Sequence, residues 1–332
     1  MIGQETREVE RKIAAILKVL SDSAEPLGGR TISRRLREQG VDLGERAVRY
    51  HLKLMDERGL THCARQRDGR LITQPGLDEL KSALVCDKVG LVISRIELLA
   101  YLTTLDLDKR SGNIPIDVSL LPKREFSRAM NIMGGIFEAG LSVSDLVAVA
   151  SEGDRLSEVL VPQGKVGFAT VASVVIDGAF LKAGIPMASR FGGILQMRNR
   201  EPLRFVDLVE YDGSTLDPFE IFIAGRMTEV DGASRQGAGK ILASFHEIPM
   251  PSSPAALEII DRLKEAELCN WLIVGKPSGL VCEMPVRLSH VGLLLPSGLN
   301  PVAAVVEAGI EVTCRTLGGV IDVERLRNFR DL

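Results

Sequence analysis

The sequence contains few of the residues that characterise disulfide-bonded, metal-binding or aromatic-rich proteins. Its 332 residues include five cysteines, four histidines and one tryptophan, and aromatic residues make up 4% of the chain. No CxxC pair occurs, and the histidines are as scattered as the cysteines. This dispersal argues against a disulfide framework and against a zinc site. We therefore expect reduced, mostly buried thiols, no bound metal and no cofactor.

Long apolar runs are missing as well. No segment approaches the length that spans a bilayer, and the charged N-terminal stretch MIGQETREVERK lacks the apolar core and cleavage site of a secretory signal. With 45% hydrophobic and 26% charged residues, the chain has ample material for buried cores. We expect a cytoplasmic protein without membrane contacts, folded as at least two domains.

Sequence motifs of common enzymes are also missing. The stretch GASRQGAGKI has neither the spacing of a phosphate loop nor a Ser or Thr after its lysine. No GxSxG elbow or HExxH helix occurs, and scattered histidines offer little general-base chemistry. We therefore predict a protein without catalytic residues. An enzyme with an appended DNA-binding domain is the alternative.

The net charge of −3 is unevenly distributed. Residues 1–85 hold 16 Lys and Arg against 13 Asp and Glu, whereas the remaining residues hold 25 against 31. Between Arg30 and Arg70, 11 basic residues stand against 6 acidic ones. A basic patch on an acidic protein is typical of a domain that contacts nucleic-acid phosphates.

The pattern of this basic region predicts a winged-helix domain over residues 1–85. Apolar residues recur at helical intervals over residues 6–20, over 31–39 and again from about residue 46, and a turn at Asp68 and Gly69 predicts a hairpin. Val48, Leu52 and Met55 fall at i, i+4 and i+7, which commits one face of the third helix to the core.

The stretch ERAVRYHLKLMDERGL resembles the recognition helix of many bacterial and archaeal winged-helix regulators. Such a helix fits the major groove of DNA, where Arg addresses guanine edges and Lys and Tyr reach phosphates, while hairpin arginines flank the backbone or minor groove. The alternative is that these side chains only solvate a helical surface. The predicted DNA contacts are Arg34, Arg46, Arg49, Tyr50, Lys53, Arg65, Arg67 and Arg70.

Residues 86–332 contain an internal repeat, because residues 166–197 resemble residues 291–323. Each copy predicts a strand, a polar turn at Asp177 or Asn300, a helix, a second strand, and an arginine before a Gly-Gly turn. Strand–helix–strand units predict crossover connections and a two-lobed α/β domain with a cleft between the lobes. Gly167, Gly184 and Arg190 align with Gly292, Gly309 and Arg315 at a separation of 125, and one inserted residue then aligns Gly192 and Gly193 with Gly318 and Gly319.

A ligand with two carboxylates would suit this duplication. Paired glycines let backbone N–H groups approach an anion, and an arginine before each pair can hold a carboxylate in bidentate fashion. The turn over residues 212–218 adds hydroxyls and amides, although a helix N-cap is the commoner use of such a cluster. The alternative is that the glycines only turn the chain and the arginines form salt bridges between lobes. The predicted effector contacts are Arg190, Gly192, Gly193, Thr215, Arg315, Gly318 and Gly319.

Four stretches, IDGAFLKAGIPMASRFGGIL, EYDGSTLDPFEIFIAGRMTEV, GAGKILASFHEIP and GLNPVAAVVEAGIEV, resemble sequence blocks of the NrpR family of nitrogen-regulatory repressors. The resemblance covers most of residues 86–323 and implies an effector-binding and dimerisation domain behind the winged helix. It further implies a homodimeric repressor of nitrogen-fixation and nitrogen-assimilation genes, which 2-oxoglutarate releases from a double-stranded DNA operator. Other regulatory or transcription proteins are further candidate partners.

We therefore predict a mixed α/β (α+β) protein. A winged helix-turn-helix over residues 1–85 precedes a bilobed α/β effector domain with internal duplication over residues 86–332. Two other functions stay open on the sequence alone: a regulator that responds to a different small carboxylate, and a dimerisation module without a ligand.

Overall fold

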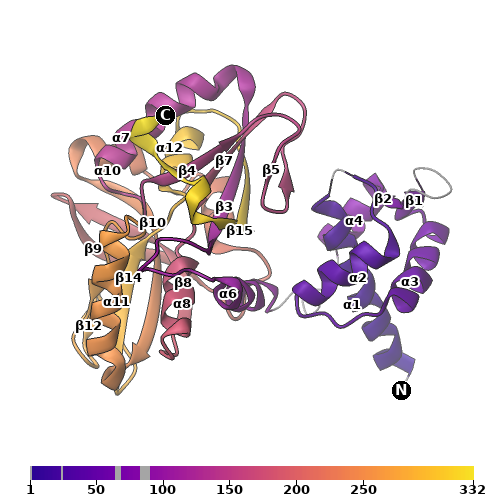
Figure 1. Cartoon of the computed structure of the whole chain (residues 1–332), viewed down its shortest axis with the longest axis horizontal. Coiled ribbons are helices and arrows are strands. Elements are labelled where there is room, and N and C mark those ends of the chain that lie inside the picture. Colours follow the sequence, from indigo (N-terminus) through magenta and orange to yellow (C-terminus); the bar gives the residue numbers. More distant parts are fainter. Residues whose placement is uncertain (1, 24, 64–68, 83–89) are drawn as a thin grey trace. The chain divides into compact units, whose positions relative to one another are not determined.

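The computed structural model describes residues 2–23, 25–63, 69–82 and 90–332 (Figure 1). The chain divides into two compact units, Met1–Ser94 and Arg95–Leu332, so that the division falls within helix α6 (Leu91–Leu102). The sequence-based boundary was placed at residue 85, and residues 83–89 lie outside the described residues. Among the helices formed by described residues, none is long and apolar enough to cross a membrane.

Unit 1 has the predicted winged-helix order of three helices followed by a hairpin. The buried positions expected on the third helix are confirmed, since Val48, Leu52 and Met55 lie in one core with Ile16 and Leu36. The hairpin strands pair in antiparallel fashion. The elements are α1 (Ile2–Ser21), α2 (Gly29–Glu38), α3 (Glu45–Glu57), β1 (Thr61–Cys63), β2 (Arg70–Ile72) and α4 (Gln74–Ser82).

Unit 2 is built on two five-stranded sheets. Sheet I has the order β15-β3-β7-β4-β16, and sheet II has the order β11-β14-β10-β8-β9. The strands of sheet I are β3 (Asn113–Pro122), β4 (Leu146–Ala150), β7 (Lys165–Val171), β15 (Thr313–Asp322) and β16 (Arg327–Asn328). Those of sheet II are β8 (Ala188–Arg198), β9 (Glu201–Glu210), β10 (Gly239–Pro249), β11 (Ile273–Val274) and β14 (His290–Pro296).

The helices and two small hairpins complete this unit. The helices are α7 (Phe126–Glu138), α8 (Val174–Lys182), α9 (Pro218–Ala224), α10 (Val230–Gln236), α11 (Ser253–Glu265) and α12 (Asn300–Glu307). The hairpins are β5 (Arg155–Leu156) with β6 (Val159–Leu160), and β12 (Leu280–Val281) with β13 (Met284–Pro285).

The predicted crossover connections are wrong. All strand pairs formed by described residues are antiparallel. The unit β7-α8-β8 begins in sheet I and ends in sheet II, while β14-α12-β15 runs from sheet II to sheet I. A strand–helix–strand pattern cannot show whether its second strand returns to the first sheet, because the two cases have the same local periodicity.

The duplication extends beyond the repeat visible in the sequence. Residues 113–198 and 239–322 carry the same order of strands, helices and short hairpin, and α7 and α11 have 13 residues each. Each sheet combines three strands of its own half with the last long strand of the other half. The segment between the halves, with β9, α9 and α10, has no counterpart. The two halves have therefore exchanged β8 and β15.

Two apolar cores stabilise the exchanged arrangement. One includes Phe137 of α7 and Val302 of α12, and the other includes Phe180 of α8 and Ile260 of α11. Figure 1 shows these helix pairs on opposite sides of the sheets. Each core takes residues from both sheets, so separating the halves would expose both cores to water.

Candidate DNA-binding surface and effector site

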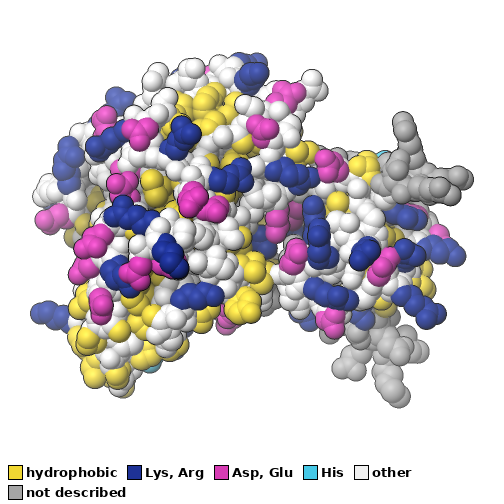
Figure 2. Space-filling view, viewed as in Figure 1, with side chains coloured by type: hydrophobic (Ala, Val, Ile, Leu, Met, Phe, Trp, Pro, Cys, Tyr) yellow, Lys and Arg dark blue, Asp and Glu magenta, His cyan; other side chains and the backbone are white. Residues whose placement is uncertain are grey.

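Helix α3 has one buried apolar face and one exposed basic face. Arg46, Arg49 and Lys53 are exposed, and the Tyr50 side chain is 61% exposed. Figure 2 shows Lys and Arg side chains spread over this unit. A helix with an exposed basic face and a fixed apolar back can enter a major groove without unfolding.

The cations of this surface are held by weak local ion pairs. Arg49 Nη2 lies 2.5 Å from Glu45 Oε1, Lys53 Nζ lies 4.0 Å from Glu57 Oε1, and Arg34 Nε lies 3.8 Å from Glu38 Oε1. Exposed pairs four residues apart on a helix contribute only about 0.3–0.5 kcal/mol each. Exchanging these carboxylates for DNA phosphates would therefore cost little.

The hairpin arginines differ in what the structure shows of them. Arg70 Nε donates to Asp56 Oδ2 at 3.1 Å, and Thr61 Oγ1 donates to the other oxygen of the same carboxylate at 2.6 Å. Arg70 therefore ties β2 to α3, and its contact with DNA stays a prediction. Arg65 and Arg67 lie outside the described residues.

In unit 2, Arg190 lies at a β-bulge of β8. Phe191 faces Phe245 of β10 and Ser189 faces His246, which leaves Arg190 without an opposed residue. Arg190 Nε lies 3.6 Å from Oε2 of the buried Glu247, a carboxylate that also accepts bonds from the backbone N and Nε of Arg287. A ligand carboxylate at Arg190 would compete with Glu247.

Arg315 precedes a larger irregularity in β15, formed by residues 316–318, which we call the β15 bulge. Arg315 faces Val118 of β3, but the next paired residue is Gly319. The residue inserted in the second repeat falls within this interruption. Leu317 has a φ of 52°, in a region that residues other than glycine rarely adopt.

Three elements hold the β15 bulge. Asp117 Oδ1 of β3 accepts a bond from Leu317 N at 2.8 Å, and Arg95 Nε of α6 donates to Leu317 O at 3.1 Å. Glu220 Oε1 of α9 accepts from both N and Oγ1 of Thr316, at 3.0 and 2.8 Å. The bulge next to the predicted effector contact Arg315 is therefore bound by side chains of β3, α6 and α9.

The predicted Gly-Gly turns are wrong, because both glycine pairs lie inside strands. A Cβ on Gly192 would stand 2.8 Å from Pro218 Cβ, and one on Gly193 would stand 2.7 Å from Phe205 Cδ1. These positions are glycine because α9 and β9 pack directly against the backbone of β8. Gly318 and Gly319 similarly lie in β15, and the role of all four as effector contacts stays a prediction.

Thr215 lies in the turn between β9 and α9. Asp217 Oδ1 accepts a bond from Phe219 N at 2.9 Å and so caps α9, which confirms the commoner use expected for this polar cluster. Helix α9 contacts both exchanged strands, β8 and β15. The elements that carry Arg190, Thr215 and Arg315 therefore meet around α9.

A buried polar chain links α8 to sheet II, and the sequence analysis missed it. Asp177 lies within α8 rather than in the predicted turn, and its Oδ1 accepts from Ser189 Oγ at 2.5 Å. His246 Nδ1 lies 3.2 Å from the same hydroxyl, and Nε2 lies 2.9 Å from Ser244 Oγ. These groups are those of a nucleophile–base–acid arrangement, but Ser244 and His246 are fully buried and therefore closed to a substrate.

Burial determines the protonation states of Asp177 and His246 in this hydrogen-bonded series. It raises the pKa of Asp177 to about 7 and lowers the pKa of His246 to about 3, because both charged forms lose hydration. Asp177 Oδ2 has no hydrogen-bond partner among the described atoms. A neutral imidazole that donates from Nδ1 to Ser189 and accepts at Nε2 from Ser244 satisfies the chain.

Three acidic residues, Asp117, Asp217 and Glu220, interact with one another at α9. Burial, and then the negative charge of Glu220, raise the pKa of Asp117 to about 7. Burial followed by Asp117 and Glu220 raises the pKa of Asp217 well above its usual range. The raised pKa values favour the protonated forms of Asp117 and Asp217, and the cluster offers no positive charge to an anion. A single Asp inside the apolar stretch IPIDVSLLP was the sequence signal that could have revealed Asp117.

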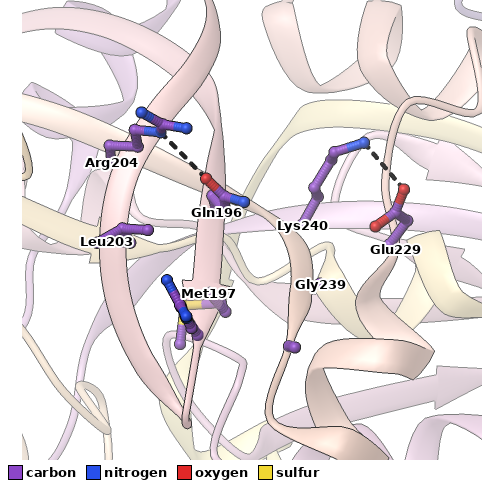
Figure 3. A pocket seen from close by; sticks show the side chains of 9 residues that line it. Gln196, Met197, Leu203, Arg204, Glu229, Gly239 and Lys240 are labelled. Carbon is purple, nitrogen blue, oxygen red and sulfur yellow. Dashed lines mark hydrogen bonds and ion pairs between the residues drawn. The ribbon is translucent and has the colours of Figure 1, made fainter.

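Two surface hollows accompany these sites. The first, of about 420 Å³, is bounded by β8, β9 and the start of β10 (Figure 3). Its Arg204 Nε donates to Gln196 Oε1 at 3.1 Å, and its Lys240 Nζ pairs with Glu229 Oε1 at 2.9 Å. The second, of about 620 Å³, includes Lys123 and Arg124. Neither hollow is lined by a predicted effector contact. Across the part of the chain that the structure describes, no three His, Cys, Asp or Glu residues group as metal ligands.

Comparison with known families identifies both parts of the chain. Residues 89–328 match the family described as NrpR regulatory domains NRD1 and 2, and residues 14–80 match the ribonuclease R winged-helix domain. A nitrogen repressor-like protein from Methanococcus jannaschii has a similar fold, with a TM-score of 0.62 and 22% identity. That match covers 73% of this chain and 98% of the other.

Relatives that match most of this chain carry related names. The global nitrogen regulator NrpRI of Methanosarcina mazei is 36% identical over 97% of this chain and 99% of its own length. The global nitrogen regulator NrpR of Methanococcus maripaludis is 31% identical over 89% of this chain, and that of Methanocaldococcus jannaschii is 28% identical over 97%. The chain matches 51% and 56% of the lengths of these last two proteins.

Proposed function

The chain belongs to the NrpR family of nitrogen regulators, and on that premise we propose that it is a DNA-binding transcriptional repressor of nitrogen-fixation and nitrogen-assimilation genes. We further propose that 2-oxoglutarate binds unit 2 and releases the protein from its operator. The observation that carries the proposal is the exposed basic face of α3 in the same chain as an NrpR regulatory domain. The protein acts as a homodimer whose two α3 helices contact the two half-sites of one operator.

The arginines of the exchanged strands support an anion site. Arg190 on β8 and Arg315 on β15 occupy equivalent places in the two halves, and each residue lies at or next to an irregularity of its strand. The two carboxylates of 2-oxoglutarate would each meet one guanidinium. A ligand held in this way joins β8 to β15 and thus acts on both sheets at once.

The β15 bulge also contacts α6, the helix within which the chain divides into its two units. Arg95 of α6 binds Leu317 O and lies 3.5 Å from Glu158 Oε2, so a shift of the bulge changes what holds α6. By linkage, if 2-oxoglutarate weakens DNA binding, DNA weakens 2-oxoglutarate binding by the same factor.

An operator titration tests the proposal. An operator is first selected from a random duplex library with the full chain, and its affinity is then measured by fluorescence anisotropy across a 2-oxoglutarate series. We expect affinity to fall with 2-oxoglutarate but not with acetate, which has a single carboxylate, at the same ionic strength. An Arg190→Gln, Arg315→Gln variant should bind the operator and lose the response. An unchanged wild-type affinity rules out this effector, and steady consumption of the 2-oxo acid would favour the enzyme alternative.

A further inference from the structure

The two halves of unit 2 provide an internal comparison of equivalent surfaces. In one half Arg155 pairs with Leu160, and in the other Leu280 pairs with Pro285, in the same hairpin register. The turns that follow the first strands also match, since Lys123 N donates to Gly164 O at 3.0 Å and Met250 N donates to Ser289 O at 2.9 Å. The backbone therefore presents the same surface twice.

The side chains on these two surfaces have opposite character. The first half carries Lys123, Arg124, Arg155 and Gln163, and the equivalent residues of the second half are Met250, Pro251, Leu280 and Leu288. The exposed fractions of Met250, Leu280 and Leu288 are 43%, 69% and 85%. The fold itself does not need apolar residues here, because charged and amide side chains occupy the same places in the other half.

We call Met250, Pro251, Leu280 and Leu288 the apolar tip. Figure 2 shows apolar side chains gathered at the end of unit 2 where Figure 1 labels β12 and α11. Clustered exposed apolar residues are typical of a surface that is covered by another molecule. Since the equivalent surface of the other half lacks them, their presence points to a contact made by this half alone.

We propose that the apolar tip is the contact through which two copies of this chain dimerise. Three exposed charged residues of both signs, Lys276, Glu283 and Arg287, lie close to these residues in the sequence and border the tip, and Arg287 pairs with the buried Glu247. A two-fold axis places each border residue of one copy against the border of the other, so an apolar centre with a border of both signs is complementary to itself. The basic surface of the first half, with Lys123, Arg124 and Lys165 around one hollow, would instead repel its own copy.

The inference deepens the proposed function, because an operator with two half-sites is bound by a protein with a two-fold axis. We therefore assign the apolar tip to a second copy of this chain. A partner that carries charge of only one sign would not be favoured by a border that carries both signs. The exchanged strands β8 and β15 connect the two halves of each copy. A dimer formed at the second half would therefore transmit a movement between halves to its partner.

The dimer contact can be tested by replacing residues of the apolar tip with side chains of the kinds found at the equivalent positions of the first half. The variant Met250→Lys, Leu280→Arg, Leu288→Gln carries side chains that the same backbone already accepts, and its fold is checked by circular dichroism. Sedimentation equilibrium should show wild type at twice the 36.1 kDa of one chain, and the variant should dissociate about 100-fold more readily, as expected for the centre of an interface. The single change Leu288→Gln, at an exposed position, should weaken the dimer by roughly 10-fold.

Exposed apolar residues of the edge strand β9 provide the matched control. The variant Leu203→Arg, Val206→Gln, Leu208→Lys should stay dimeric. A monomeric wild type, an apolar-tip variant that stays dimeric, or loss of the dimer in the β9 variant would each overturn the proposal. A dimeric wild type without DNA binding would contradict the proposed function and leave the dimer contact standing, so the two failures are distinguishable.

Discussion

Arg49 combines exposure, a weak partner and a central place on α3. Its ion pair with Glu45 joins residues four apart, and its Cγ would stand 3.0 Å from a Cβ placed on Gly29. The bare backbone at Gly29 therefore lets α2 and α3 approach closely beneath this arginine. The guanidinium is carried on the exposed face of a rigid helix, as a base or phosphate contact requires.

Replacing Arg49 with Ala should weaken operator binding by about 1–3 kcal/mol, or roughly 5- to 150-fold, if it contacts a guanine edge. The helix itself should persist, because alanine is the best helix former. Arg235→Ala in unit 2 is the charge-matched control, since Arg235 is exposed and pairs with Asp231 within its own helix. Equal affinities of the two variants would remove Arg49 from the DNA surface.

Asp177 and His246 make the free energy of unfolding depend on pH in opposite directions. The folded pKa of Asp177, about 7, lies above its ordinary value of 3.8, so its contribution is full below pH 3.8 and is lost as pH rises through about 7. The folded pKa of His246, about 3, lies below its ordinary 6.5, so its contribution is full above pH 6.5 and is lost as pH falls towards 3. Asp117 follows the pattern of Asp177, because its pKa is also raised to about 7.

The variant Asp177→Asn should therefore gain stability relative to wild type as the pH increases from about 5 to 8. The introduced amide keeps an oxygen for the Ser189 hydroxyl and removes the buried charge. Calorimetric Tm values at the two pH values measure the effect, with the exposed Asp212→Asn as control. A constant difference from wild type across this range would show that Asp177 does not take up a proton on folding.

At the scale of elements, hydrogen bonds join the β15 bulge to α6 and to β3. Arg95 of α6 donates to Leu317 O, and Leu317 N donates to Asp117 of β3. Arg110 offers a comparison, because it also donates to a backbone carbonyl, Glu265 O at 2.8 Å, which is not part of the bulge.

Arg95→Gln should leave operator binding in the absence of effector close to wild type and reduce its 2-oxoglutarate response towards a ratio of 1. The reason is that α6 loses its bond to the bulge, while the basic face of α3 is unchanged. Anisotropy titrations with and without 2-oxoglutarate provide the two affinities, and Arg110→Gln should respond normally. A full response in the Arg95 variant would place the coupling elsewhere.

The close packing of α9 against the glycines of β8 leads to a prediction about stability. Gly192→Ala should destabilise unit 2 by about 1–3 kcal/mol, because its methyl group would overlap Pro218 and force α9 away from β8. Urea unfolding followed by circular dichroism measures the change. Gly213→Ala is the control, since a Cβ there meets nothing within 4 Å. If both variants unfolded at the same urea concentration, the close packing of α9 on β8 would be in doubt.

At the scale of the whole molecule, a dimer brings each basic side chain to DNA twice. The logarithm of the operator association constant should fall linearly with the logarithm of salt concentration, with a slope of about −0.9 for each phosphate neutralised. Unit 2 is acidic, so the dependence arises from unit 1.

Lys53→Gln should reduce the magnitude of this slope by about 1.8 if two copies bind one operator, and by about 0.9 if one copy binds. Measurements from about 50 to 200 mM salt suffice. Lys264→Gln, on the exposed surface of α11, should not change the slope. A slope unaffected by Lys53→Gln would show that Lys53 does not contact a phosphate.

Local sequence pattern determined much of this protein. Helical spacing and a turn predicted the winged-helix order and the buried face of α3, since those features depend on residues close along the chain. The alignment of Arg190 with Arg315 likewise revealed a duplication, and resemblance in four stretches identified the family. These predictions needed no knowledge of which strands pair.

The tertiary structure alone decided how the two halves combine. The repeat predicted crossovers within lobes, whereas β8 and β15 are exchanged between sheets, and Gly192 and Gly193 serve the packing of a strand rather than a turn. The hydrogen bonds of Asp117 and Asp177 join residues on different elements and could not be read from spacing. The physical reason is that strand pairing and buried polar contacts are long-range, so one local pattern is compatible with several arrangements until the cores select one.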